Sequence, residues 1–284
     1  MWQRAGLGAW PVAAESEYNP GMLDRKRLRR GLPVDGLGLP LHFYRTIGST
    51  NDRAAELAAQ GAPQGTLVVA DEQTAGRGRA GRRWITPPGS ALAFSLVLRP
   101  QASGPSAIGP LNALGALAVV DALAEVGVSA QVKWPNDVVL GGRKACGVLV
   151  EASWLDGSLQ AVVLGIGLNV ATASVPPLPA LDYPATCVQA ALKANVDRVD
   201  LLLGLLAAIA AWLPRLKSPE LVDAWQARLA FMHQDVILIG PEGQVRGELL
   251  GLAPDGRARI RSTAGETLLM GGEGISLRPV DMPE

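Results

Sequence analysis

Short β-rich apolar runs and helically spaced apolar positions alternate along the chain from Leu41 onward, which is typical of a mixed α and β domain. The apolar runs predict strands at residues 41–44, 66–71, 91–98, 147–154 and 160–169, with a strand–turn–strand at 132–140. Helical spacing and capping residues predict helices at about 49–60, 111–125, 200–213 and 219–230.

The pattern changes after His233, where short strands are separated by tight turns. Strands are predicted there at residues 236–239, 245–252, 257–261 and 266–269, which together indicate a small β-barrel. Residues 1–38 show no sustained periodicity, and we interpret them as an N-terminal extension for which disorder is one option. The chain therefore divides into an extension at 1–38, a large domain at 39–231 and a barrel at 232–284.

Composition narrows the class of protein. With 48% hydrophobic and 18% charged residues, the chain can bury a large core. Its 26 basic and 26 acidic residues cancel, so no overall field draws it toward nucleic acid or lipid. Two cysteines form no disulfide framework, the first residues do not resemble a signal peptide, and the apolar run at 201–213 is too short to span a membrane. We expect a reduced, cytoplasmic protein that does not enter membranes.

The loop at residues 71–84 has the highest concentration of candidate ligand-binding residues. Three glycines alternate there with four arginines directly after a predicted strand. Glycine lets the backbone approach a ligand closely, and arginine binds phosphate or carboxylate groups. A small-molecule phosphate site and an RNA-binding loop both fit this composition. We expect the loop to be exposed and mobile without ligand and to close when ligand binds. Trp84 either stacks on a base or anchors the loop in the core.

Further polar groups stand at the ends of predicted strands. Asn136 and Asp137 lie on a tight turn, where they contact magnesium or a nucleotide, or merely stabilise the turn. Lys144 is either a solvated edge charge or a cation that reaches into a pocket. Asn169 follows two strand glycines and either contacts a purine or ribose or is a core residue.

Taken in order, these segments resemble the biotin–protein ligase family. The resemblance covers roughly residues 41–170, and the tail at 271–278 resembles the final barrel segment of the family. The matching pieces are Gly48-Ser49-Thr50-Asn51, Gln73, Gly76 through Trp84, Lys133-Trp134-Pro135-Asn136-Asp137, Lys144 through Glu151, and Gly167 through Asn169. The resemblance implies an α+β fold: a catalytic domain like that of class II aminoacyl-tRNA synthetases, with a mixed sheet, and an SH3-like barrel at the C-terminus.

The resemblance also implies roles for individual residues. The residues expected to bind biotin are Ser49, Thr50, Asn51, Gln73, Arg77, Gly78, Arg79 and Lys144. The residues expected at ATP are Arg77, Arg79, Arg82, Trp84, Asn136, Lys144 and Asn169. Arg79, Lys144 and Asp137 would be catalytic, with magnesium carried by the ATP phosphates near Asp137.

The implied activity joins biotin to AMP and then passes biotin to a lysine of a biotin carboxyl carrier protein, with ATP and Mg²⁺ required. The alternatives are a lipoate–protein ligase, a noncatalytic RNA-binding protein and a pseudoenzyme that serves as a biotin-binding module. The residues before position 41 are too few for the helix-turn-helix of the DNA-binding members, so no DNA binding is expected. A homodimer is left open. Ala80 replaces an arginine that some relatives carry.

Overall fold

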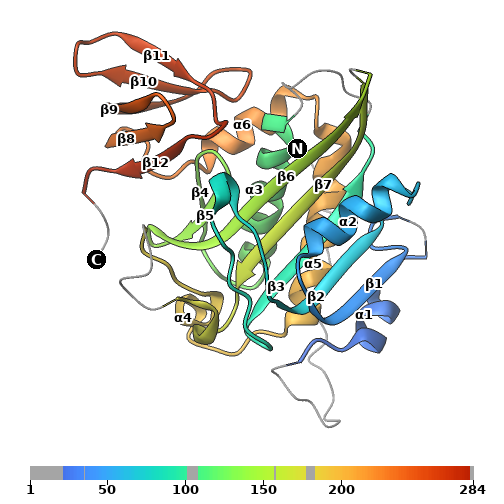
Figure 1. The fold of residues 1–284 in the computed structure, drawn as a ribbon. Coiled ribbons are helices and arrows are strands. Elements are labelled where there is room, and N and C mark those ends of the chain that lie inside the picture. The colour runs from blue at the N-terminus through green and yellow to red at the C-terminus, as the bar shows by residue number, and fades with distance from the viewer. Residues whose placement is uncertain (1–21, 35, 101–107, 157, 177–182, 282–284) are drawn as a thin grey trace, which may run out of the picture.

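Seven strands form one sheet in the computed structural model, in the order β1-β2-β3-β7-β6-β5-β4 (Figure 1). The structure describes residues 22–34, 36–100, 108–156, 158–176 and 183–281. The strands are β1 (Leu41–Ile47), β2 (Leu67–Gln73), β3 (Ala91–Leu98), β4 (Gln131–Lys133), β5 (Asp137–Leu140), β6 (Arg143–Leu155) and β7 (Ser158–Asn169). Strands β1 and β2 are parallel and the other neighbouring pairs are antiparallel, so the predicted mixed sheet is confirmed.

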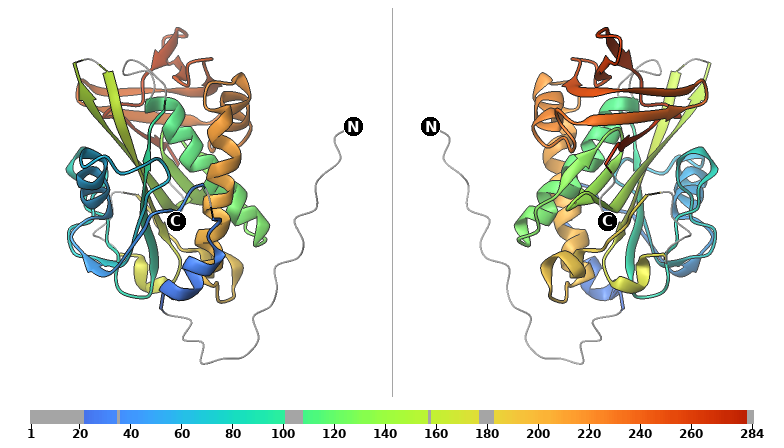
Figure 2. Two further views of the ribbon diagram at one scale, coloured as in Figure 1. Left: turned by 90° about the vertical axis from the view of Figure 1, so that its right-hand side faces the viewer. Right: turned by 90° about the vertical axis from the view of Figure 1, so that its left-hand side faces the viewer.

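Helices cover both faces of this sheet (Figure 2). Helix α2 (Thr50–Ala59) packs on one face against β2, β3 and β7. Helices α3 (Ile108–Glu125) and α5 (Arg198–Trp212) pack on the other face, and α6 (Pro219–Ala227) lies beside α3. The short α4 (Val188–Leu192) follows β7. Within the described ranges, no helix is long and apolar enough to cross a membrane.

A second sheet follows at the C-terminal end of the chain. Its strands are β8 (Asp235–Gly240), β9 (Gly243–Leu252), β10 (Ala258–Ser262), β11 (Thr267–Met270) and β12 (Ser276–Pro279). They are ordered β11-β10-β9-β8-β12, with antiparallel neighbours. The expected α+β class with a small second β unit is confirmed. Strand β12 was not predicted as a separate strand, although its first three residues lie in the tail at 271–278 that resembles the final barrel segment of the family.

The N-terminal extension contains an element that its sequence pattern did not predict. Helix α1 (Arg25–Gly31) is capped by Asp24 and packs against α5. Its Leu28 is fully buried, and Arg27 forms ion pairs with Asp197 and Asp200. A helix of one or two turns buries too few apolar residues to show a helical period in the sequence. Contacts with the rest of the fold therefore determine that these residues form a helix. Residues 1–21 lie outside the described residues, and the domain boundaries at 38 and 231 stay predictions.

Candidate active site

A cavity of about 400 Å³ lies where the start of α2 and the end of β2 face strands β5 to β7 beneath the loop at residues 74–84. Residues 274–276, at the start of β12, complete its wall. All the site residues expected from the sequence line this cavity: Ser49, Thr50, Asn51, Gln73, Arg77, Gly78, Arg79, Arg82, Trp84, Asn136, Asp137, Lys144 and Asn169. The topology therefore brings together segments more than a hundred residues apart, while the ligand contacts of each residue stay predictions.

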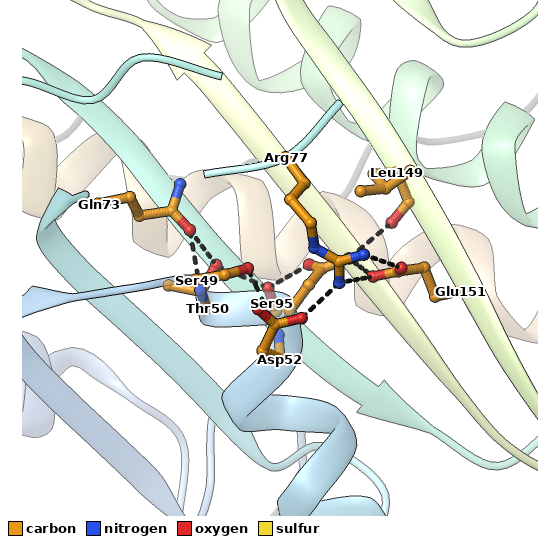
Figure 3. A network of polar contacts seen from close by, with 9 residues as sticks. Ser49, Thr50, Asp52, Gln73, Arg77, Ser95, Leu149 and Glu151 are labelled. Atoms are coloured by element: carbon orange, nitrogen blue, oxygen red, sulfur yellow. Dashed lines mark hydrogen bonds and ion pairs between the residues drawn. The ribbon is translucent and has the colours of Figure 1, made fainter. Parts of the chain in front are cut away.

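One end of the cavity carries uncharged hydrogen-bonding groups (Figure 3). Gln73 Oε1 accepts from the Thr50 backbone N–H at 2.8 Å and from the Thr50 hydroxyl at 3.1 Å. This orients the Gln73 amide, whose Nε2 lies 3.3 Å from Thr86 Oγ1. Ser49 caps α2, because its Oγ accepts from the Asp52 backbone N–H. An oriented amide and hydroxyl suit a neutral ligand group that both donates and accepts hydrogen bonds.

Asn51 lies behind this end and is only 5% exposed. Its Oδ1 accepts from Ser95 Oγ at 2.6 Å, and its Nδ2 donates to Glu151 Oε2 at 2.6 Å and to the Leu149 carbonyl at 3.4 Å. A Cβ at Gly165 would collide with the Asn51 amide, so the glycine in β7 makes room for this side chain. Because both amide hydrogens are engaged, Asn51 is better suited to shaping the cavity than to the direct ligand contact predicted for it.

The loop at 74–84 is fastened to the domain by Arg77. Its guanidinium pairs with both carboxylate oxygens of Glu151, at 2.8 and 2.9 Å, and lies 2.5 Å from Asp52 Oδ1. Inside the loop, the Gly78 N–H donates to the Arg82 carbonyl at 2.7 Å. Protein carboxylates thus offset part of the repulsion among the arginines of this loop. Mobility of the loop without ligand stays a prediction.

Arg79 links the loop to two other segments of the chain. Its Nη1 donates to Asn136 Oδ1 at 2.8 Å, and its Nη2 donates to the Gly272 carbonyl. Burial lowers the pKa of the guanidinium, which nevertheless remains charged at neutral pH. Arg79 therefore places a largely desolvated positive charge at the wall of the cavity.

Asp137 lies between two lysines on neighbouring strands. Pairing of β4 with β5 places Lys133 opposite Asp137, and the β5–β6 hairpin brings in Lys144. Lys133 Nζ lies 2.8 Å from Oδ2 of Asp137, and Lys144 Nζ lies 2.5 Å from Oδ1. Burial alone would raise the pKa of Asp137, but the two ammonium groups outweigh it and hold this pKa well below its usual range. The cluster thus presents a net positive charge.

Direct binding of magnesium by Asp137, one of the alternatives that the sequence left open, does not fit this arrangement. Both carboxylate oxygens already contact ammonium groups, whereas Mg²⁺ is held through direct carboxylate oxygens and water. Across the described part of the chain, no group of three or more His, Cys, Asp or Glu side chains is placed to hold a metal ion. Magnesium at this cavity would have to arrive with the phosphates of its ligand.

Trp84 packs across two glycines that face each other in β6 and β7. Gly147 and Gly167 are paired in the strand register, and a Cβ on Gly167 would collide with the indole. Lys144 Nζ lies 5.8 Å from the ring centroid. The buried indole Nε1 has no hydrogen-bond partner among the described residues. Trp84 therefore forms a wall of the cavity, and its contact with a nucleotide base stays a prediction.

Asn169 ends β7 and is engaged with the protein. It is buried, and its Nδ2 donates to the Thr186 carbonyl at 3.1 Å. This bond holds the segment before α4 beside the cavity and leaves the carbonyl oxygen and the second N–H of the amide available to a ligand.

Sequence reasoning missed several residues that organise the cavity. Lys133 and Glu151 stood inside the quoted motifs, yet neither was given a role. A cation and a carboxylate in otherwise apolar strands are a usable signal, since unpaired charges are rarely buried. Ser95 gave no signal, because one serine in the apolar strand β3 has many structural explanations. Tyr183, whose ring lies 4.8 Å from Lys133 Nζ, was equally hidden.

The comparisons with known proteins agree with this geometry. Residues 43–169 match the model of the Biotin/lipoate A/B protein ligase family. The bifunctional ligase/repressor BirA of Bacillus spizizenii is 39% identical over 185 residues, which are 64% of this chain and 56% of that protein. The chain thus matches only about half of that relative's length.

Two further relatives align over nearly their whole length. The biotin–[acetyl-CoA-carboxylase] ligase of Paracoccus denitrificans is 38% identical over 234 residues, covering 79% of this chain and 95% of that protein. The solved structure of biotin protein ligase from Aquifex aeolicus in complex with biotin and ATP has a TM-score of 0.71 and 31% sequence identity, and the match covers 84% of this chain and 97% of that one. With the cavity and its motifs in the same chain, these matches show that the protein belongs to the biotin–protein ligase family.

Proposed function

We propose that this protein is an ATP-dependent biotin–protein ligase that forms biotinyl-5′-AMP and transfers biotin to a lysine of a carrier protein. The observation that carries the proposal is the polarity of the cavity. One end offers the neutral groups of Thr50 and Gln73, and the other offers the cations Arg79 and Lys144. Biotin has a neutral ureido head, an apolar body and a carboxylate, and it must meet a nucleotide phosphate at its acid end.

In the first step, an oxygen of the biotin carboxylate attacks the α-phosphorus of MgATP, and pyrophosphate leaves. Two anions must approach each other, so the protein's task is to neutralise charge and to align the reactants. Arg79 and Lys144 lie at the cavity wall as cations suited to this task. No covalent intermediate with the enzyme is needed, because carboxylate and ATP react directly.

In the second step, a lysine amine of the carrier attacks the acyl carbon of biotinyl-AMP, and AMP leaves. Asp137, which the family resemblance implies to be catalytic, is poorly suited to deprotonating this amine. Its depressed pKa makes it a weak base, and both of its oxygens contact ammonium groups. Asp137 is therefore better suited to holding Lys144 in position, and the amine would lose its proton to solvent or to the departing phosphate.

The acceptor is proposed from the chemistry and from the relatives. The Paracoccus relative is named for an acetyl-CoA carboxylase, whose biotin-carrying domain supplies a reactive lysine. We expect the reaction in the cytoplasm, and the two free, buried cysteines are compatible with a reducing compartment.

One incubation tests the proposal. The purified protein is mixed with MgATP, biotin and a biotin carboxyl carrier domain, and the mass of the carrier and the release of pyrophosphate are followed. We expect one biotinyl group per carrier and no reaction when lipoate replaces biotin. Lipoate transfer, or binding of RNA without pyrophosphate release, would favour the corresponding alternative function instead.

A further inference from the structure

We propose that Glu151 is a positioning residue that fastens the loop at residues 74–84 to the end of the cavity formed by Thr50 and Gln73, where biotin is proposed to bind. Glu151 thereby sets how tightly biotin and biotinyl-AMP are retained. This inference rests on the proposed function. Glu151 lies in β6, away from the cationic end of the cavity. Its carboxylate contacts two segments that are far apart in the sequence, through Arg77 in the loop (Figure 3) and Asn51 in α2. A third connection runs from Asn51 to Ser95 in β3.

The first two connections run through the carboxylate itself. Both Glu151 oxygens accept from the guanidinium of Arg77 in the loop, and Oε2 also accepts from Asn51 Nδ2 at the start of α2, at 2.6 Å. Bidentate pairs of this kind are directional as well as strong. A neutral amide at position 151 would present one acceptor and one donor, so it could not receive all three hydrogen bonds.

The third connection reaches the groups expected to meet the ureido head. Because Asn51 directs Nδ2 at Glu151, its Oδ1 must face Ser95, whose hydroxyl donates to it at 2.6 Å. Ser95 has one hydroxyl proton, and Asn51 accepts it. The Thr50 hydroxyl, 2.8 Å from Ser95 Oγ, therefore keeps its own proton for Gln73 Oε1. The Thr50 oxygen then keeps a lone pair for a ligand N–H. The charge of Glu151 thus fixes the polarity of this hydrogen-bond chain.

Asp52 alone cannot replace this arrangement. It contacts Arg77 through one oxygen at 2.5 Å, and its side chain is 56% exposed compared with 33% for Glu151. Exposed single contacts contribute little, since water competes for both partners. Asp52 also has no hydrogen bond to Asn51 among those that the structure describes. It therefore does not determine which groups donate and which accept in the hydrogen bonds that join Asn51, Ser95 and Thr50.

The experiment compares wild type with Glu151→Gln, Asp52→Asn and Glu56→Gln. The last is a matched control on α2, because Glu56 pairs with Arg53 outside the cavity. We measure biotin affinity by titration, KM and kcat for biotin-dependent pyrophosphate release, and the escape rate of biotinyl-AMP in the absence of a carrier. For Glu151→Gln we expect KM and the escape rate to rise about tenfold with kcat changed less than about twofold, whereas Asp52→Asn changes them less and Glu56→Gln not at all.

A double-mutant cycle with Arg77→Gln separates positioning from a general structural role. If Glu151 acts through Arg77, Arg77→Gln/Glu151→Gln should be much less impaired than the product of the single effects predicts. Unchanged KM and escape rate in Glu151→Gln, equal falls in kcat and kcat/KM, or multiplicative effects in the cycle would overturn the inference while leaving the proposed function intact. A wild-type protein that makes no biotinyl-AMP would instead refute the proposed function itself.

Discussion

Nζ of Lys144 lies 2.5 Å from Oδ1 of Asp137, while the opposite oxygen of the same carboxylate contacts the buried Lys133. The two lysines differ in access, because the Lys144 side chain is 27% exposed and that of Lys133 only 3%. Lys133 therefore neutralises Asp137 from within the fold, and Lys144 is the ammonium available to a bound carboxylate or phosphate.

Replacing Lys144 with Ala should abolish the first reaction at moderate biotin concentration. The variant removes the partly exposed cation at the point where the proposed mechanism brings two anions together, so pyrophosphate release should fall by more than about a hundredfold. Asp137 keeps Lys133 as a partner, so the fold should persist. Pyrophosphate release that continued undiminished would show that charge neutralisation by this lysine is not part of the mechanism.

Asp137→Asn should destabilise the protein by about 3–5 kcal/mol, since it leaves the ammonium of Lys133 buried without a carboxylate. Denaturant unfolding measures this. The exposed pair of Asp255 with Arg257 provides the control, and Asp255→Asn should cost at most about 1 kcal/mol. Equal losses in the two variants would contradict the burial assigned to the Lys133–Asp137 pair.

The same pair predicts how stability depends on pH. The folded-state pKa of Asp137 lies below that of an unfolded aspartate, so its ion pairs contribute fully above about pH 4. That contribution is lost as the pH falls below about 4 toward the lower folded-state pKa. Wild type should therefore lose stability more steeply than Asp137→Asn below pH 4. Parallel pH curves for the two proteins would contradict the predicted shift.

Arg79→Gly should leave the fold intact and let biotinyl-AMP escape or form slowly. The substitution removes the bonds from the loop to Asn136 and Gly272, so the loop loses its attachment at the cationic end of the cavity. Free biotinyl-AMP in a filtrate and the rate of its synthesis are the measurements. Normal values for both would exclude this part of the loop from the mechanism.

Motifs in the sequence predicted the position of the cavity because each occupies a strand end or a helix start. Ser49 caps α2 at the start of the helix predicted at about 49–60, and the glycines at 147 and 167 lie where Trp84 needs space. Such positions are recognisable, since capping and close approach restrict the residue types that fit.

Partnerships between distant side chains were not predictable in the same way. Nothing in the local sequence indicates that Arg77 meets Glu151, or that Asp137 is shared between two lysines, because both depend on strand order and register. For the same reason the sequence could not decide whether Asp137 binds magnesium directly, because a carboxylate on a turn suggests a metal until its neighbours on adjacent strands are known.

Helix α1 was also not predicted from the sequence, because its formation depends on distant contacts. The substitution Leu28→Ala tests whether this helix contributes to the stability of the folded domain. Leu28 is fully buried, so the truncation should cost about 2–4 kcal/mol if α1 is part of the folded domain. Unfolding in denaturant measures the loss, with the exposed Val34→Ala as the control. A loss below about 0.5 kcal/mol would mean that residues 25–31 contribute little to stability.

Gly167→Ala should displace the Trp84 indole from its packing position without creating a cavity in the core. An added Cβ at this position of β7 would collide with the indole, which must then leave the glycine pair and carry the end of the loop away with it. Backbone strain is no factor, because Gly167 has no positive φ. Gly271→Ala is the matched control, since its added Cβ meets nothing within 4 Å and its φ is also not positive.

The intrinsic fluorescence of the protein should shift in Gly167→Ala, and KM for ATP should rise by about tenfold or more if Trp84 forms the nucleotide wall of the cavity. An unchanged KM for ATP together with a displaced indole would show that Trp84 anchors the loop and does not contact the nucleotide, which would decide between the two roles that its sequence position allowed.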